Sequence, residues 1–424
     1  MFSRRKLLFS SAGGALGGLL MGRRASAQPP AEATHAHLAP SRRSTGRTPT
    51  VTPNGASLPF RMENGVKVFH LTAEPVKREF LDKAPDGSGF TVNCWGYNGM
   101  TPGPTIEAFE GDRVRIHVTN KLPEGTSIHW HGFILPNGMD GVTGLTQPKI
   151  APGETFAYEF TLKQTGTLMY HPHFDEMTQI ALGMHGFFVV HPRQAARRID
   201  RDFAIFLNEW FIKPGTATPD PTVMLDFNVF TFNSRVFPAT APLLVRTGDR
   251  VRIRVANLTM SSHPMHLHGH RFFVTGTEGG PIPETAWIPE STINVPVGTT
   301  RDVEFVADNP GDWPFHCHKS HHTMNQMSHG LPNLINVDIS KTQEALDALT
   351  PGTMIMGTTG MGELTEMAMP IPRNSIAMRA AEGPYGPIDM GGMFTVVKIR
   401  DHIDYARDPG WYQQPRGTGA VRVD

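Results

Sequence analysis

The chain contains the stretch EGDRVRIHVTN at residues 110–120, and a near copy of it, TGDRVRIRVAN, returns at residues 247–257. Both copies alternate apolar and polar side chains, which is typical of a strand with one buried face. Short β-branched and aromatic runs broken by Gly and Pro surround them, for example at 155–160 and 186–190. These runs favour an all-β fold, and the repeat indicates two copies of one sandwich or barrel domain.

Histidine pairs occur at equivalent places in both copies. A His-x-His-Gly motif follows each repeated stretch, and a further His-x-His falls on the last long strand of each copy. The pairs are His129 with His131, His171 with His173, His266 with His268, and His316 with His318. Because side chains alternate along a strand, both imidazoles of a pair lie on one face. Four such pairs in matching positions indicate a metal site.

The last of these pairs flanks a cysteine. The segment HCHKSHHTMNQMS, residues 316–328, contains Cys317, with His322 five residues later and Met327 ten residues later. Thiolate, imidazole and a weak thioether form the ligand set of a blue copper electron-transfer site. His316 and His318 face the other way and could bind a second centre. Cys317 would then be a covalent link between two metal sites, which predicts electron transfer.

Composition narrows the class of protein further. A length of 424 residues suggests about two to three domains. Lys and Arg total 39 and are balanced by 39 Asp and Glu, so nothing indicates a nucleic-acid partner or an anionic membrane surface. The counts of 20 His, 21 Met and 2 Cys suit copper binding rather than a disulfide framework. A Cys94–Cys317 disulfide is disfavoured because Cys317 lies in a histidine cluster, and Cys94 has no predicted role.

The N-terminus has the features of an export signal. A twin-arginine start at residues 3–8 precedes an apolar run at 7–21, and Ala25-Ser26-Ala27 forms a cleavage site. We therefore expect a twin-arginine signal peptide at 1–27 and a periplasmic or exported protein. The apolar run is too short and too rich in glycine to span a membrane, and no other segment is long enough. Residues 28–57 predict a flexible linker.

The repeats place domain 1 at residues 58–195 and domain 2 at 200–340, and a Met- and Gly-rich C-terminal extension occupies 341–424. Eight methionines lie between Met354 and Met393. Thioethers bind Cu(I) well, so this segment could be an entry site for cuprous ions. Adaptable packing of a C-terminal arm explains the methionines equally well.

The motifs resemble the copper-binding signature of multicopper oxidases. All four parts match in order between about residue 95 and 330: His129-x-His131-Gly132, His171-x-His173, His263-Pro264-x-His266-Leu267-His268-Gly269 and His316-Cys317-His318-x3-His322-x4-Met327. The chain is most similar to the two-domain members, the small laccases, because the 185 residues from His131 to His316 leave no room for a middle domain. The resemblance implies two tandem cupredoxin-like Greek-key β-sandwich domains.

The resemblance also implies four copper ions and their ligands. A type 1 copper would bind His263, Cys317 and His322, with Met327 as a long axial ligand. A type 2 copper would bind His129 and His266. The two type 3 ions would bind His131, His171 and His318 on one ion, and His173, His268 and His316 on the other. Asp140 matches the acidic residue near the cluster and is a candidate proton relay; a plain Asp-Gly turn is the alternative.

When the motifs of the two domains are compared, domain 1 has no type 1 site of its own. Pro172 replaces the cysteine, and Glu176-Met177 stand where a distal histidine would fall. This places the chain with relatives whose blue copper is in domain 2. In those relatives the three-copper cluster lies between domain 1 of one chain and domain 2 of the next, and the implied assembly is a homotrimer.

The expected activity couples one-electron oxidation of a reductant to four-electron reduction of O2 to water. The reductant is either a phenol-like molecule or Cu(I). Two alternatives stay open. A two-domain copper nitrite reductase is disfavoured by Pro172 and by the complete type 3 set. A non-enzymatic copper-binding or tolerance protein is disfavoured because a cysteine link between two sites exceeds what storage needs.

Overall fold

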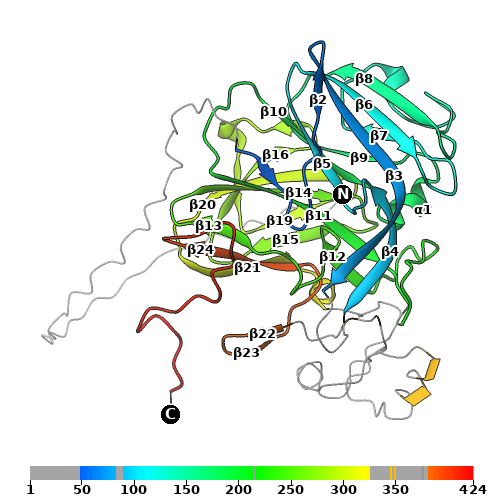
Figure 1. Cartoon of the computed structure of the whole chain (residues 1–424). Coiled ribbons are helices and arrows are strands. Elements are labelled where there is room, and N and C mark those ends of the chain that lie inside the picture. Colours follow the sequence, from blue (N-terminus) through cyan, green and yellow to red (C-terminus); the bar gives the residue numbers. More distant parts are fainter. Residues whose placement is uncertain are drawn as a thin grey trace, which may run out of the picture. The chain divides into compact units, whose positions relative to one another are not determined.

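The computed structural model describes residues 48–82, 89–213, 215–324, 344–345, 348–349, 374, 376 and 381–423. The prediction of an all-β fold is confirmed, because strands dominate these residues (Figure 1). The helical elements between residues 48 and 324 are short: α1 (Glu176–Ala181), η1 (Asn137–Met139), η2 (Glu284–Ala286) and η3 (Ser320–Thr323). No helix in the described part of the chain is long and apolar enough to cross a membrane. The expected signal peptide lies outside the described residues.

Domain 1 consists of two sheets that pack face to face. One has the order β2-β3-β6-β8, with β4 beside β3; the other has the order β5-β10-β9-β7. The first repeated stretch forms β6, and its alternate residues Val114, Ile116 and Val118 are fully buried in the core between the sheets. The bounds are β2 (Arg61–Glu63), β3 (Val66–Leu81), β4 (Phe90–Tyr97), β5 (Gly103–Phe109), β6 (Arg113–Asn120), β7 (His129–His131), β8 (Thr155–Thr161), β9 (Gly166–His171) and β10 (Gly186–His191).

Domain 2 repeats this plan with a larger first sheet. The second copy of the repeat forms β14, which lies between β11 and β20 in the order β1-β11-β14-β20-β16-β17, with β12 beside β11 and β18 beside β16. The bounds are β1 (Thr50–Val51), β11 (Arg201–Trp210), β12 (Val229–Phe232), β14 (Arg250–Asn257), β16 (Phe272–Thr277), β17 (Gly280–Pro281), β18 (Ile288–Glu290) and β20 (Thr299–Val306). Two cupredoxin-like sandwiches therefore follow each other along the chain.

The second sheet of domain 2 includes a strand from the C-terminal extension. Its order is β13-β24-β21-β15-β19, with β13 (Leu243–Arg246), β15 (His263–Leu267), β19 (Thr292–Val295), β21 (Gly311–Cys317) and β24 (Phe394–Arg400). Strand β24 pairs antiparallel with β21 and parallel with β13. Domain 2 as folded therefore does not end at residue 340, because a segment of the extension 341–424 completes its sheet. A separate hairpin pairs β22 (Ala381–Gly383) with β23 (Gly386–Ile388).

The N-terminal boundary also differs from the prediction. Residues 50–57, which we expected to belong to a flexible linker at 28–57, are part of the fold. Strand β1 pairs parallel with β11, with Thr50 opposite Asp202. The Thr50 amide donates to Glu107 of domain 1 at 3.1 Å. This segment therefore contacts both domains.

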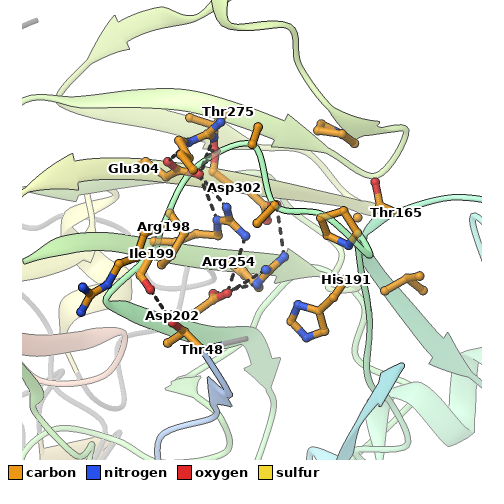
Figure 2. A pocket seen from close by; sticks show the side chains of 18 of the residues that line it. Thr48, Thr165, His191, Arg198, Ile199, Asp202, Arg254, Thr275, Asp302 and Glu304 are labelled. Atoms are coloured by element: carbon orange, nitrogen blue, oxygen red, sulfur yellow. Dashed lines mark hydrogen bonds and ion pairs between the residues drawn. The ribbon is translucent and has the colours of Figure 1, made fainter. Parts of the chain in front are cut away.

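A buried network of charges joins the two domains (Figure 2). Arg254 of β14 donates to both carboxylate oxygens of Asp202 at 2.8 Å, and the Thr167 hydroxyl of β9 in domain 1 donates to Asp302 at 2.6 Å. Beside them Glu304 accepts two hydrogen bonds from Arg197, each at 2.7 Å. Burial alone would raise the pKa of Glu304, but its arginine partners lower it to about 2. The charged members of this network line a cavity of about 290 Å³, and the hydrogen bond from Thr167 to Asp302 connects the network to domain 1.

Candidate metal centres

Three potential ligands converge inside domain 2. His263 begins β15, Cys317 ends β21, and His322 lies in η3, and all three side chains are fully buried. The Cys317 Sγ lies 3.6 Å from His263 Nδ1 and 3.5 Å from His322 Nδ1. The two Nδ1 atoms are 3.1 Å apart. This type 1 trio is one of two sets of three side chains, within the described residues, whose potential ligand atoms all lie within 4.8 Å of one another.

The chemistry of the type 1 trio fits a copper ion. Burial lowers the pKa of His263 to about 3, so its imidazole is neutral at neutral pH and can donate a lone pair. Burial raises the pKa of the Cys317 thiol to about 12, so a metal ion would displace its proton on binding. Two imidazole nitrogens and one sulfur facing a common point match the trigonal ligand set of a blue copper site.

Sequence reasoning missed an acidic residue behind this trio. Glu209, near the end of β11, is buried, and its Oε1 lies 3.6 Å from His263 Nε2 and 3.7 Å from His322 Nε2. Burial raises its pKa, and a hydrogen bond from the Ser261 hydroxyl opposes the rise. The hydrogen-bond partner of His263 Nε2 is the Thr259 hydroxyl at 2.9 Å, and Glu209 adds an acidic group next to the outer nitrogens of both imidazoles. An acidic residue just after the apolar run 203–207 is the only sequence signal for it.

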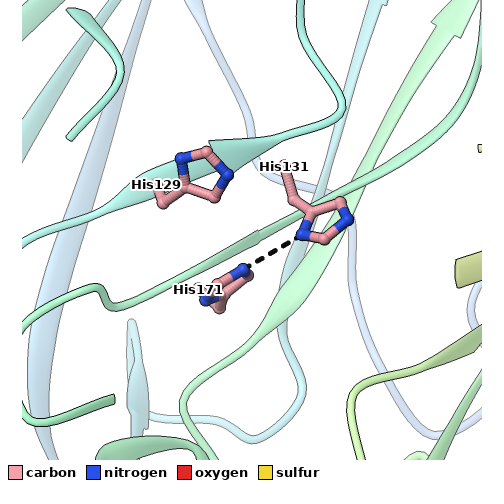
Figure 3. A group of neighbouring side chains, drawn as sticks. All are labelled: His129, His131 and His171. Carbon is pink, nitrogen blue, oxygen red and sulfur yellow. Dashed lines mark hydrogen bonds between the residues drawn. The ribbon is translucent and has the colours of Figure 1, made fainter. Parts of the chain in front are cut away.

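A second group of imidazoles lies on domain 1. His129 and His131 are on β7, and His129 is paired in register with His171 on β9. His131 Nδ1 and His171 Nε2 are 3.2 Å apart (Figure 3). Ring centroids of His129 and His173 are 5.6 Å apart. The ligand atoms of His129, His131 and His171 lie within 4.8 Å of one another, so three of these four predicted ligands could bind one ion.

Two carboxylates border the domain 1 histidines. The main-chain oxygen of Asp140 is 2.8 Å from His129 Nδ1, and its carboxylate is 3.5 Å from the same atom. The predicted relay residue is therefore in contact with a predicted ligand. Glu176, which has no predicted role, lies 3.5 Å from His171 Nδ1 and 3.7 Å from His173 Nε2. Its place next to two histidines follows from the start of α1, which sequence periodicity did not indicate.

The matching histidines of domain 2 form a third group. His266 and His316 face each other across β15 and β21, as His129 and His171 do in domain 1. His268 Nε2 and His316 Nε2 are 3.0 Å apart. The ring of His318 lies 5.4 Å from that of His266 and 5.6 Å from that of His316. Burial lowers the pKa of His316 to about 4, which keeps it neutral.

The two four-histidine groups do not join within the described part of one chain. No set of three metal-binding side chains found there draws on both domains. A cavity of about 690 Å³ is lined by the domain 1 histidines together with Glu209, Met260 and Gly298 of domain 2, but by none of the domain 2 histidine group. Met327, the predicted axial ligand, lies outside the described residues.

Fold and site together define a copper protein built of two cupredoxin-like domains. Residues 83–195 and 214–335 each match a family model described as multicopper oxidase. A solved multicopper oxidase named mgLAC is 28% identical, with a TM-score of 0.58, over 78% of this chain and 86% of that one. The solved blue copper oxidase from Nitrosomonas europaea is 26% identical, with a TM-score of 0.57, over 78% and 85%.

Laccases from two fungi are similar over part of the chain. Laccase-1 of Cryptococcus neoformans var. grubii is 32% identical over 50% of this chain and 39% of its own length. Laccase-2 of Botryotinia fuckeliana is 32% identical over 65% and 49%. The chain thus spans less than half the length of these curated relatives. The chain belongs to the multicopper oxidase family, and this membership implies copper as its cofactor.

Proposed function

We propose that this protein is an oxidase that couples one-electron oxidation of a reductant to the four-electron reduction of O2 to water. The observation that carries the proposal is the position of Cys317. Its sulfur belongs to the buried type 1 trio, while its two neighbours, His316 and His318, belong to the histidine group on the other face of the sheet. One residue therefore links a site that can receive electrons to a group that can bind the metals at which oxygen is reduced.

Four copper ions would serve this function. Type 1 copper is assigned to the type 1 trio. Type 2 copper is assigned to His129 and His266, and the type 3 ions to His131, His171 and His318, and to His173, His268 and His316. Close contacts support part of this division, since His131 lies 3.2 Å from His171, and His268 lies 3.0 Å from His316. When bound, the copper ions would store and transfer electrons one at a time.

The protein's own groups would orient ligands and supply protons. The Glu209 carboxyl group lies 3.6 Å and 3.7 Å from the outer nitrogens of two type 1 imidazoles and would help to orient their rings. Asp140 contacts His129 and is only partly exposed, so it can pass a proton from solvent toward the histidine group. Oxygen reduction to water consumes four protons for four electrons, which makes an acid at this place useful.

The three-copper cluster would form between subunits. Each chain provides two separate four-histidine groups of matching geometry, one on each domain. Joining domain 1 of one chain to domain 2 of the next would complete a cluster, and head-to-tail contacts of this kind close into rings. We propose a homotrimer as that ring.

Export and substrate complete the proposal. The twin-arginine segment supports a periplasmic or exported location, where copper and its reductants are found. The reductant is a phenol-like molecule or Cu(I), and the methionines at 354–393 would serve Cu(I) oxidation if they bind cuprous ions. Deleting residues 354–389 should lower cuprous oxidation far more than phenol oxidation while sparing β24. Equal loss of both would contradict the cuprous role.

Copper content, absorption spectrum and oxygen uptake test the central proposal. The purified protein should contain four copper ions per chain, show an intense blue band with a near-ultraviolet shoulder, and consume O2 with a reducing dye. Reduction of nitrite in place of O2 would favour the nitrite reductase. Copper binding without either turnover would favour the non-enzymatic alternative.

A further inference from the structure

The loop that carries the type 1 ligands closes against the start of β24. The Cys317 amide donates to the main-chain oxygen of Met393 at 3.1 Å, and the Met393 amide donates to the main-chain oxygen of His322 at 3.0 Å. The Gly391 amide donates to Thr323 at 2.6 Å. The backbone of Met393 therefore makes hydrogen bonds to two of the three residues of the type 1 trio.

The sheet register places the Met393 side chain on the same face as the cysteine sulfur. His316 is paired with Phe394 at the end of the antiparallel ladder of β21 and β24, and the hydrogen bond from the Cys317 amide to Met393 extends this register by one residue beyond the ladder. Residues opposite each other in such a ladder project to the same side. Met393 is fully buried in the core cluster that contains Cys317, Val397 and Ile399, whereas Phe394 packs in a different cluster on the other face.

A glycine permits this close approach. Gly392 has a φ of +56°, and a Cβ at this position would lie 2.5 Å from the main-chain oxygen of His322. Any larger residue would push the segment away from the ligand loop. The backbone therefore brings residue 393 to a fixed position against the trio.

We infer that Met393, and not Met327, provides the axial thioether of the type 1 site. This inference rests on the proposed function, since it names a fourth ligand for the copper assigned to His263, Cys317 and His322. A thioether is the weak axial donor of blue copper sites, and its identity tunes their reduction potential. Met393 then lies 71 residues after His322 in the sequence. Strand β24 must therefore pair with β21 before the type 1 site has all four of its proposed ligands.

A second methionine provides a matched control. Met265 on β15 lies opposite Cys317 on the other side of β21, and it is fully buried in the same core cluster. Met265 is paired in the ladder with Cys317 alone among the trio, whereas the backbone of Met393 is hydrogen-bonded to both Cys317 and His322. Met265→Leu therefore reproduces the loss of a buried thioether beside the cysteine without removing the proposed ligand.

The experiment compares Met393→Leu, Met393→Gln, Met265→Leu and Met327→Leu in the copper-loaded full chain. The readouts are the blue absorption band, the electron paramagnetic resonance spectrum and the equilibrium with a one-electron redox dye. Leucine at 393 removes a donor that favours the electron-poor Cu(II), so it should raise the potential and shift the dye equilibrium about tenfold, or about 59 mV for one electron. Glutamine is a stronger oxygen donor and should shift it in the opposite direction. Met265→Leu and Met327→Leu should leave it within about twofold, or about 18 mV by the same conversion.

The outcomes separate this inference from the proposed function. A blue wild-type protein in which Met327→Leu shifts the potential and Met393→Leu does not would overturn the axial assignment alone. Shifts of the same sign for leucine and glutamine at 393 would also overturn it, because they indicate a packing effect. A wild-type protein that binds copper without a blue band would instead defeat the proposed function.

Discussion

Domains 1 and 2 share the same arrangement of strands and differ in the side chains that occupy matching positions in their interiors. Asn120 and Asn257 end the two repeated strands and make matching hydrogen bonds: each side-chain amide donates to a loop carbonyl four residues later, at 2.8 Å and 2.9 Å. Alignment on these strands places Thr126 where domain 2 has His263. The outward-facing histidine pairs are present in both domains. The inward-facing metal ligands are present only in domain 2.

In domain 1, a hydrogen-bonded network occupies the interior position at which domain 2 has the type 1 trio. The Thr126 hydroxyl donates to Gln179 Oε1 at 2.7 Å, and the fully buried Gln179 amide donates to Glu124 at 2.8 Å and to the Gly125 carbonyl at 2.9 Å. Every polar atom of that side chain has a partner, so no donor atom is left for an ion. One sandwich therefore stabilises its interior with a hydrogen-bond network, and the other presents two imidazoles and a thiol.

The largest expected effect follows from removing the sulfur. Cys317→Ser should abolish the blue band and reduce oxygen consumption to background, because serine is a poor copper ligand and the link to His316 and His318 is lost. Circular dichroism should remain close to that of the wild type. The reciprocal change in domain 1, Pro172→Cys, should create no second blue band, since Thr126 and Gln179 provide no imidazoles. Retained turnover in Cys317→Ser would contradict the proposed electron path.

The separation of the two histidine groups predicts complementation between subunits. His131→Ala and His268→Ala should each be inactive, because each removes one half of the cluster. Random mixing of equal amounts, with dissociation and reassembly, should restore about a quarter of wild-type activity per chain, because half of the domain 1 sites are intact and half of those meet an intact domain 2 in a head-to-tail ring.

The mixing experiment has a simple control. Each variant mixed with itself by the same procedure should remain inactive, and sedimentation should show the same assembly in all samples. A cluster formed within one chain would give no recovery in the mixture, and that result would remove the inter-subunit proposal.

A substitution at Glu209 tests whether copper affinity at the type 1 trio of domain 2 depends on the acidic residue next to its two histidines. Glu209→Gln keeps the shape but removes the negative charge near His263 and His322, so copper affinity at the blue site should fall by roughly 10- to 100-fold. Competition with a copper chelator, followed by the blue band, measures this. Glu176→Gln in domain 1 is the matched control and should leave that affinity unchanged. An equal loss in both variants would show a general charge effect.

The histidine groups were predictable because their signal is local. A His-x-His pair on a strand fixes the face of both imidazoles, and the repeat fixes which pairs correspond. The registers of β7 with β9 and of β15 with β21 then bring the predicted members together. The assignment of each histidine to an ion stays a prediction.

Strand β24 and Glu209 were not predictable because their signals are distant. The sequence FTVVKIR at 394–400 follows a long Met- and Gly-rich segment, and nothing in it specifies β21 as its partner. Glu209 gains its meaning from His263 and His322, 54 and 113 residues further along the chain. Strand β1 likewise depends on pairing with β11, which a local composition of Thr, Pro and Gly does not show.

Gln179 gives the smallest expected effect and completes the comparison. Gln179→Ala leaves the Gly125 carbonyl without its side-chain partner and leaves the Thr126 hydroxyl only its longer contact with the Ser127 carbonyl at 3.3 Å, which should destabilise domain 1 by about 1–3 kcal/mol. Hydrogen exchange of the amides around α1 and β7 measures this locally, and the exposed Gln194→Ala should show no change. The blue band should be unaffected, because the network lies in the other domain. If Gln179→Ala altered the blue band without changing exchange in domain 1, the two interiors would not be independent, and the contrast between a closed network and a metal site would fail.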